Sequence, residues 1–313
     1  FGSSHFGSRT LAPTPADPSH SWKAMPLFGA CAGTKGQTTK CGIRVVPQDR
    51  LGVSEPPPEW FGNEPNPARG TPQAKGWSNG NWLKSRFHFN FAEYSGGPSS
   101  FGVLRVMNDD LVQPARGFDT HPHRDMEILT FVVDGSLTHK DSEGNAETLG
   151  RGSIQFMTAG SGIRHSEHNW DREQPLRFIQ SWVTPRQRGL RPNYGSMVGD
   201  ELAAEARRNK WAHLVGDAAD GAPVPVQINQ DCSVFACEVS SGSAAPPLEL
   251  RAGRQAYMLC VEGSLEAAGG GRMARHDAAE LKGPMTLELT ASAEGTLVLV
   301  FEMAETRDGR ADI

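Results

Sequence analysis

Two short segments of the sequence each place two potential metal ligands two residues apart. His121 and His123 form the first pair, and His165 and Glu167 form the second. Because successive side chains of a β-strand alternate between its faces, residues two apart point the same way. Each pair can therefore hold one ion from a single strand. Imidazoles combined with a carboxylate, with coordination positions left open, suit a redox-active Fe(II) ion.

The residues around these pairs predict short strands separated by turns. β-branched and aromatic residues between Ile128 and Val133 favour a strand that ends at Asp134 and Gly135. Further strands are expected at 146–149, 153–157 and 163–167. Turn composition is found at 140–145 and 159–162. Strands and turns in this succession are typical of an antiparallel sandwich or barrel.

The sequence around both pairs resembles the metal-binding half of a cupin and, in detail, the pirin family. The resemblance rests on 76–78 (GWS), 87–91 (FHFNF), 104–110 (LRVMNDD), 121–128 (HPHRDMEI) and 157–167 (MTAGSGIRHSE). Pirins are bicupins, with two jelly-roll β-barrels in one chain and a single iron in the N-terminal barrel. The resemblance therefore implies an all-β bicupin fold. It also implies that the iron ligands are His121, His123, His165 and Glu167.

The resemblance to pirins implies a site more firmly than a reaction. Some pirins are similar to quercetin 2,3-dioxygenases, which open the heterocycle of a flavonol with O2. For such an enzyme, one mononuclear Fe(II) is expected, although histidine and carboxylate also accept other divalent transition metals. Glu167 is the expected catalytic residue, because it can accept the hydroxyl proton of a flat polyphenol as well as hold the ion. Candidates for an apolar substrate slot are Met107, Phe131, Phe156 and Met157.

Four other polar residues near the motifs are not expected to bind the metal. Glu127 is expected to bond a ligand imidazole and fix its tautomer. His139 and His168 are expected at the surface or in turns, and His88, which alternates with aromatic residues, is expected to be structural.

A length of 313 residues favours about two domains. The expected organisation is an irregular N-terminal arm (1–42), a metal-binding barrel (43–190) with a Pro-rich insertion (54–74), a second barrel (191–303) and a polar tail (304–313). Residues 43–46 are expected to form the first strand of the N-terminal barrel, and residues 200–210 a short helix.

The second barrel is expected to carry no metal. Its histidines, His213 and His276, stand alone in the sequence, and neither ligand motif recurs there. An acidic residue followed by Gly-Ser after an apolar strand occurs in both halves, at 134–136 and 262–264, which is a weak sign of internal duplication.

Composition argues against several classes of partner. A formal net charge of −5 provides no basic field, so direct nucleic-acid binding is not expected. No run of eighteen apolar residues is present, so no membrane span is expected. Five cysteines without a CxxC motif favour a reducing, intracellular location. The cytoplasm is the expected compartment, with the nucleus or an organelle left open.

Two alternatives to the dioxygenase remain open from the sequence. In the first, the protein is a non-catalytic subunit of a larger assembly. Residues 1–42, which are rich in Gly, Ser, Pro and Thr, and the insertion at 54–74 would then dock onto protein partners. In the second, which follows from the animal member of the family, it is an iron-dependent regulatory cofactor.

Overall fold

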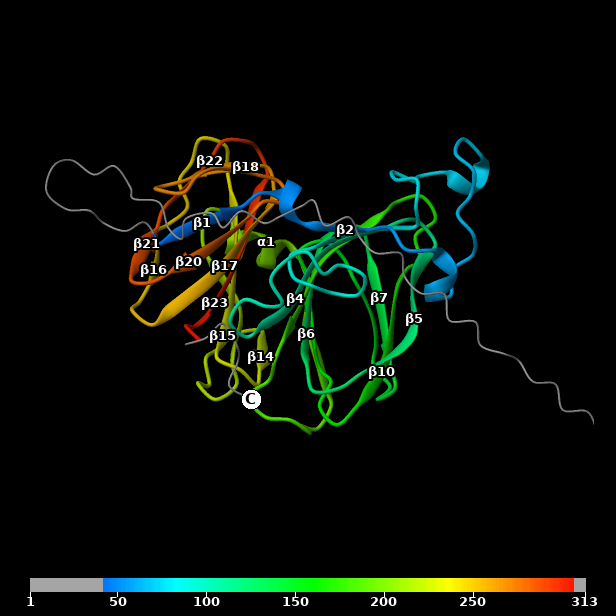
Figure 1. Ribbon diagram of the computed structural model, residues 1–313, viewed down its shortest axis with the longest axis horizontal. Helices are drawn as coiled ribbons and strands as arrows, with labels where there is room; N and C mark the ends of the chain where they lie inside the picture. Colours follow the sequence, from blue (N-terminus) through cyan, green and yellow to red (C-terminus); the bar gives the residue numbers. More distant parts are fainter. Residues whose placement is uncertain (1–41, 307–313) are drawn as a thin grey trace, which may run out of the picture.

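The computed structural model describes residues 42–306, which form two β-barrels packed against each other (Figure 1). The all-β, two-barrel fold expected from the sequence is therefore confirmed. Residues 1–41 and 307–313, which include most of the expected arm and tail, lie outside the described residues.

The N-terminal barrel is built from two sheets. The larger sheet contains, in spatial order, β12 (Asn193–Met197), β9 (Ile154–Thr158), β6 (Glu127–Asp134), β11 (Leu176–Val183), β4 (Leu104–Val112), β3 (Leu83–Phe87) and β2 (Gly52–Ser54). The smaller sheet contains β5 (Arg116–His123), β10 (Ile163–Asn169), β7 (Leu137–Asp141) and β8 (Ala146–Leu149). The strands expected around the two ligand motifs are all present in these sheets.

The C-terminal barrel contains one large and two small sheets. The large sheet contains β1 (Ile43–Val46), β20 (Ala278–Lys282), β17 (Arg254–Glu262), β23 (Thr296–Ala304), β15 (Cys232–Val239), β13 (Ala212–Asp217) and β14 (Val226–Ile228). The small sheets contain β19 (Gly271–Ala274), β18 (Ser264–Ala267) and β22 (Leu289–Ala291), and the pair β16 (Leu248–Leu250) and β21 (Met285–Leu287).

Helical structure is confined to short segments of the described residues. The α-helix α1 (Glu201–Arg207) lies within the range expected to be helical, and its N-cap Asp200 accepts a hydrogen bond from the Ala203 amide. Three 3₁₀ helices are η1 (Gln48–Arg50), η2 (Pro58–Phe61) and η3 (Pro72–Ala74). No helix in residues 42–306 is long and apolar enough to cross a membrane.

The first strand of the chain belongs to the second barrel, which corrects the expectation for residues 43–46. β1 pairs antiparallel with β20, with Ile43 opposite Leu281 and Val46 opposite Ala278. In Figure 1 this blue strand lies among the orange and red strands of the C-terminal barrel. Local sequence favours a strand here but does not specify its partner, because pairing depends on residues far along the chain. The expected limit between the barrels at 190/191 also falls too early, because β12 pairs with β9 in the first barrel. The other domain limits stay predictions.

The two large sheets pack face to face and bury the main apolar cluster between the barrels. This cluster joins Leu129, Phe131 and Phe156 of the first barrel to Val234, Tyr257 and Phe301 of the second. Inside the first barrel, a separate cluster includes Val132, Leu137 and Phe178. Alternation along each strand decides which core a residue enters: in β6, Phe131 faces the second barrel and Val132 faces the interior.

This alternation also corrects the proposed substrate-lining residues. Met107, Phe131 and Phe156 all belong to the cluster between the barrels, so they do not face the interior of the first barrel. Met157 is the one of the four that packs in an interior cluster, beside Ile128 and Ile163.

Candidate metal centre

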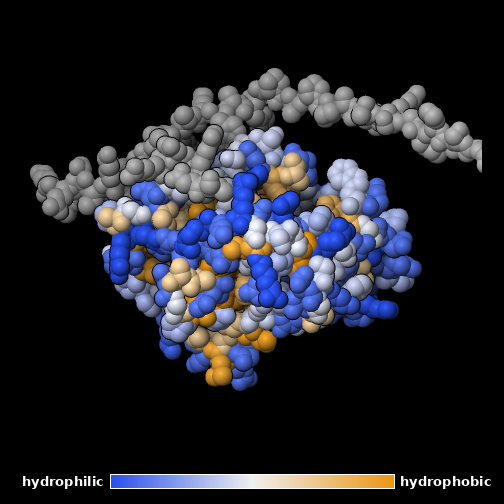
Figure 2. All heavy atoms as spheres, turned by 90° about the horizontal axis from the view of Figure 1, so that it is seen from below, coloured by the Kyte–Doolittle hydropathy of each residue, from blue (hydrophilic) through white to orange (hydrophobic). Residues whose placement is uncertain are grey.

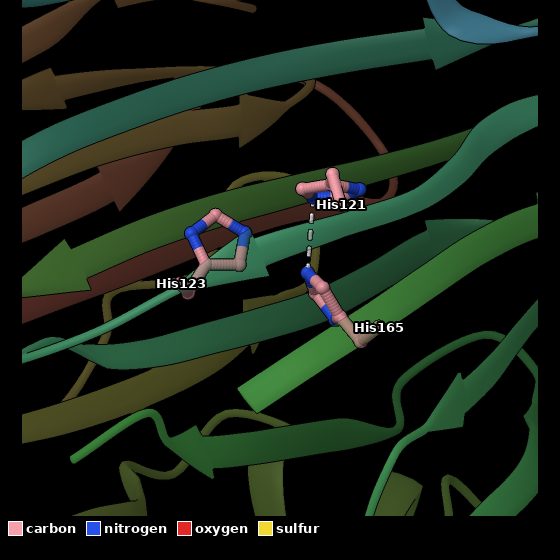
Figure 3. Close-up of side chains that lie close together, drawn as sticks. All are labelled: His121, His123 and His165. Carbon is pink, nitrogen blue, oxygen red and sulfur yellow. Dashed lines mark hydrogen bonds between the residues drawn. The ribbon is translucent and has the colours of Figure 1, made fainter. Parts of the chain in front are cut away.

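Three imidazole rings from two neighbouring strands converge inside the N-terminal barrel (Figure 3). β5 carries His121 and His123, β10 carries His165, and the pairing of these strands places His165 directly opposite His121. The ring centroid of His165 lies 4.6 Å from that of His121 and 4.8 Å from that of His123. Each ring offers one nitrogen, and these three nitrogens lie within 4.8 Å of one another.

The hydrogen bond of His121 fixes which of its nitrogens is free. Nδ1 of His121 lies 2.7 Å from the backbone carbonyl oxygen of Asp119, and a carbonyl can only accept, so Nδ1 carries the proton. A neutral ring then has a lone pair on Nε2. This Nε2 lies 3.1 Å from Nε2 of His165.

The separation of these two nitrogens fits a pair of ligands of one ion. With a metal–nitrogen bond of about 2.1 Å, two ligands at a right angle lie about 3.0 Å apart. The observed 3.1 Å matches that spacing. The donor set of three imidazoles and a nearby carboxylate is suited to a divalent transition metal.

Burial keeps His123 and His165 in the neutral form that binds metals. Loss of solvation, followed by repulsion from the neighbouring imidazoles, lowers the pKa of His123 to about 3. The same two causes lower the pKa of His165 to about 2. Both rings are therefore neutral at physiological pH, and each retains a nitrogen lone pair that can bind a metal.

Glu167 lies beside this cluster rather than within it. Its carboxylate forms a second group with His139 and His165, whose ligand atoms lie within 4.8 Å of one another. Between His165 and Glu167 the pairing of β10 with β5 is shifted by a bulge, which places Glu167 opposite Phe118. The four predicted ligands are thus close together, with His165 common to the two groups.

Three side chains from the large sheet orient the Glu167 carboxylate. Gln180 donates to Oε2 at 2.8 Å, and Gln155 donates to Oε1 at 3.2 Å. The Thr130 hydroxyl lies 3.4 Å from Oε1. Sequence reasoning missed these residues. Thr130 could have been identified, because it is a polar residue between Ile128 and Val132 on the inward face of an apolar strand.

A polar layer therefore crosses the barrel between two apolar clusters. One cluster includes Val132 and Phe178, and the other includes Ile128 and Met157. Asn108 of β4 is opposite Gln180, and its buried Oδ1 has no hydrogen-bond partner. Such a group is expected to bind water or a ligand in the interior.

His139 and Glu127 differ from their expected positions. His139 is fully buried on β7, with Nδ1 lying 3.4 Å from Nδ1 of His165, so the prediction of a surface or turn residue is wrong. Glu127 faces the second barrel, where it accepts hydrogen bonds from Thr158 at 2.7 Å and Asn229 at 3.0 Å. It does not bond an imidazole, because odd-numbered residues of β6 point away from the interior.

The other two histidines occupy supporting positions. His88 is buried between the barrels with Nδ1 lying 3.0 Å from the Tyr257 hydroxyl, as expected of a structural residue. His168 stacks on Trp170 outside the barrel interior and lies 3.2 Å from the Asp119 carboxylate.

The Pro-rich insertion braces the strand that carries the HxH pair. β5 is an edge strand, and Asn63 pairs with Gly117 through both atoms of its side-chain amide, at 2.7 and 3.0 Å. Phe61 packs edge-on against Phe118. The insertion therefore covers an otherwise open sheet edge next to the metal centre.

Comparison with known proteins agrees with this architecture. Residues 70–183 match the pirin family, and residues 217–303 match the quercetinase C-terminal cupin domain. The chain belongs to the pirin family. The first match contains His121, His123, His165 and Glu167, and the second covers most of the C-terminal barrel of this pirin.

Individual relatives of this pirin include bacterial proteins. A pirin-like protein of Caulobacter vibrioides is 36% identical over 220 residues, which cover 70% of this chain and 92% of the relative. The quercetin 2,3-dioxygenase of Escherichia coli K12 is 40% identical over 163 residues, covering 51% of this chain and 67% of the relative. The E. coli pirin YhhW in complex with nickel(II) is 27% identical and superimposes with a TM-score of 0.67, covering 84% of this chain and all of YhhW.

Proposed function

We propose that this pirin is a quercetinase-type dioxygenase with one mononuclear metal ion, Fe(II), in the N-terminal barrel. The main support is the pair of Nε2 lone pairs of His121 and His165, which face each other at 3.1 Å beside His123. The relative named quercetin 2,3-dioxygenase supports a flavonol substrate and O2. The nickel(II) complex of YhhW supports a divalent metal.

Four residues are proposed to hold the metal, namely His121, His123, His165 and Glu167. When bound, the ion supplies Lewis acidity that favours the deprotonated form of a substrate hydroxyl. Glu167 is placed to accept that proton, because its carboxylate lies beside the ligand His165. Gln155 and Gln180 keep the carboxylate oriented by donating hydrogen bonds to opposite oxygens.

Turnover of a flavonol tests the proposal directly. Protein loaded with Fe(II) should bleach the quercetin absorbance in the presence of O2, and His121→Ala should lose this activity because it removes a proposed ligand. Metal content is measured in the same samples by elemental analysis. A fully loaded protein without turnover would exclude the dioxygenase.

A second candidate, a docking role for the insertion at 54–74, has one specific observation in its favour. Trp60 is 68% exposed, whereas its neighbour Phe61 is packed against Trp82 and Phe118. An exposed tryptophan held on an anchored loop is suited to a protein partner. Recovery of partners by wild type and Trp60→Ala tests this role, and equal recovery would argue against it. The expected docking by residues 1–42 falls almost entirely outside the described residues.

A further inference from the structure

The proposed metal ligands leave one buried histidine unexplained. His139 has no exposed surface, and its two ring nitrogens face different groups. Nε2 lies 3.3 Å from Oδ2 of Asp141, and Nδ1 lies 3.4 Å from Nδ1 of His165. The three side chains therefore form a chain that ends at the proposed metal centre.

The partners in this chain fix where the protons lie. An ionised Asp141 can only accept, so Nε2 of His139 carries a proton and Nδ1 of the neutral ring is an acceptor. Nδ1 of His165 must then donate to it. This leaves the lone pair of His165 on Nε2, the atom that faces Nε2 of His121 at 3.1 Å. Each proton position follows from the hydrogen-bond network.

Asp141 is held rigidly at the start of its turn. Its Oδ1 accepts hydrogen bonds from the backbone amides of Glu143 and Asn145, both at 3.0 Å. The Asn145 side chain donates to Oδ2 at 2.9 Å. Although burial opposes ionisation, the hydrogen bonds from Asn145 and His139 lower the pKa of Asp141 below its usual value.

The ring of His139 is also fixed from the side. It stacks on Tyr194 of β12 with centroids 4.5 Å apart and an interplanar angle of 17°. The Tyr194 hydroxyl, which has one proton to donate, lies 3.0 Å from a carboxylate oxygen of Glu147 and 3.0 Å from the amide oxygen of Gln155, whose NH2 group donates to Glu167. His139 is thus oriented at its edge and its face.

We propose that Asp141 and His139 are positioning residues that hold His165 in the tautomer protonated at Nδ1 and thereby set the metal affinity of the site. The inference rests on the metal site of the proposed function. It extends that site by two residues that lie behind a ligand and do not touch the metal. Partners of this kind commonly change metal affinity by about 10- to 100-fold.

Asp141→Asn breaks the hydrogen-bonded chain Asp141–His139–His165, here called the relay, and keeps the acceptor of the two turn amides. The asparagine retains an Oδ1 that can accept the two turn amides, but its NH2 group cannot accept from Nε2 of His139. His139 is then driven to carry its proton on Nδ1, facing His165, which must move its own proton to Nε2. Affinity for nickel(II), measured by calorimetric titration, should fall by about 10- to 100-fold.

Two further variants keep the test decisive. Asp134→Asn is the matched control, because Asp134 is exposed and its Oδ1 accepts only the backbone amide of Gly135 in the preceding turn. It should bind nickel(II) like wild type. His139→Phe retains an aromatic ring against Tyr194 but removes the relay, so it should weaken binding as Asp141→Asn does. Wild-type affinity in both relay variants would overturn the proposal.

The tautomer itself is read from long-range ¹H–¹⁵N correlations of the metal-free protein. His165 should be protonated at Nδ1 in wild type and at Nε2 in Asp141→Asn. A wild-type His165 protonated at Nε2, or an unchanged tautomer in the variant, would overturn the relay whether or not the protein binds nickel(II). Failure of wild type to bind any divalent metal would instead reject the proposed metal site.

Discussion

At the scale of single residues, the site is defined by the direction of lone pairs and donors. The backbone carbonyl of Asp119 and the proposed Asp141–His139 relay each place a proton on Nδ1 of a histidine, so two Nε2 atoms face each other. The Glu167 carboxylate is likewise oriented by its partners, since Gln155 and Gln180 each donate to one of its oxygens. Positions that present only acceptors to one another are stabilised by a cation, which is the physical basis of the proposed metal centre.

The carboxylate of Glu167 provides a prediction at this scale. Glu167→Gln retains the shape of the side chain but removes the carboxylate that accepts the proton and places an NH2 group opposite one of the two donors, Gln155 or Gln180. At full metal loading, kcat for a flavonol should fall at least about 100-fold. Steady-state turnover with parallel metal analysis measures this. Glu143→Gln, in an exposed turn, is the control, and unchanged turnover of a loaded Glu167→Gln would remove Glu167 from the mechanism.

At the scale of elements, the metal centre depends on an edge strand that is braced from outside. β5 has β10 on one side, and on the other Asn63 substitutes for a strand neighbour by bonding both backbone groups of Gly117. The insertion therefore contributes to the fold even if Trp60 also contacts a partner. Covering an open edge also reduces unwanted pairing with other chains.

Removal of this brace should loosen β5. Asn63→Ala loses two hydrogen bonds, at a cost of about 1–3 kcal/mol in the free energy of unfolding. The amide of Gly117 should exchange with solvent faster, because its acceptor is gone. Hydrogen exchange measured by NMR tests this. Gln73→Ala, on the exposed side of the same insertion, should leave exchange unchanged, and equal protection in Asn63→Ala would show that the brace is unimportant.

At the scale of the whole molecule, polar contacts connect the two barrels around the shared apolar core. Arg177 is buried and donates to both oxygens of Asp109, at 2.8 and 2.7 Å, and to the carbonyl of Val261 in the second barrel. His276 of the second barrel also contacts Asp109, at 2.5 Å. In contrast to the apolar cluster between the barrels, the surface seen in Figure 2 is mainly hydrophilic, with apolar residues scattered among polar ones. Among the described residues, the largest apolar cluster is the one that the two barrels share.

Breaking the buried ion pair should destabilise the protein strongly. Arg177→Met leaves Asp109 without its guanidinium and should cost about 3–5 kcal/mol in the free energy of unfolding. Chemical denaturation measures the change, with the exposed Arg172→Met as control. The double variant with Asp109→Leu should regain much of the loss, since no buried charge is left unpaired. A single variant as stable as wild type would contradict this role.

The interface also predicts a dependence of stability on pH. Burial, the largest cause, lowers the pKa of His88 to about 4, against 6.5 for an exposed histidine. Between these values the unfolded chain binds more protons than the folded one. The free energy of unfolding is therefore not reduced by His88 above pH 6.5, and it decreases as the pH falls from 6.5 toward 4. The contribution is about 3 kcal/mol. His88→Gln should reduce the loss measured by denaturation at pH 7 and pH 4.5, and an equal loss in both proteins would disprove this account.

The sequence by itself determined the strands and the ligand pairs. Alternation with a period of two is a local property, so it specified that His121 and His123 share a face and that His165 and Glu167 share another. Only the tertiary structure decided which strands are neighbours. It placed β1 in the second barrel, His139 behind His165 and Glu127 against Asn229. The reason is that pairing and burial depend on contacts between distant parts of the chain, which no local pattern specifies.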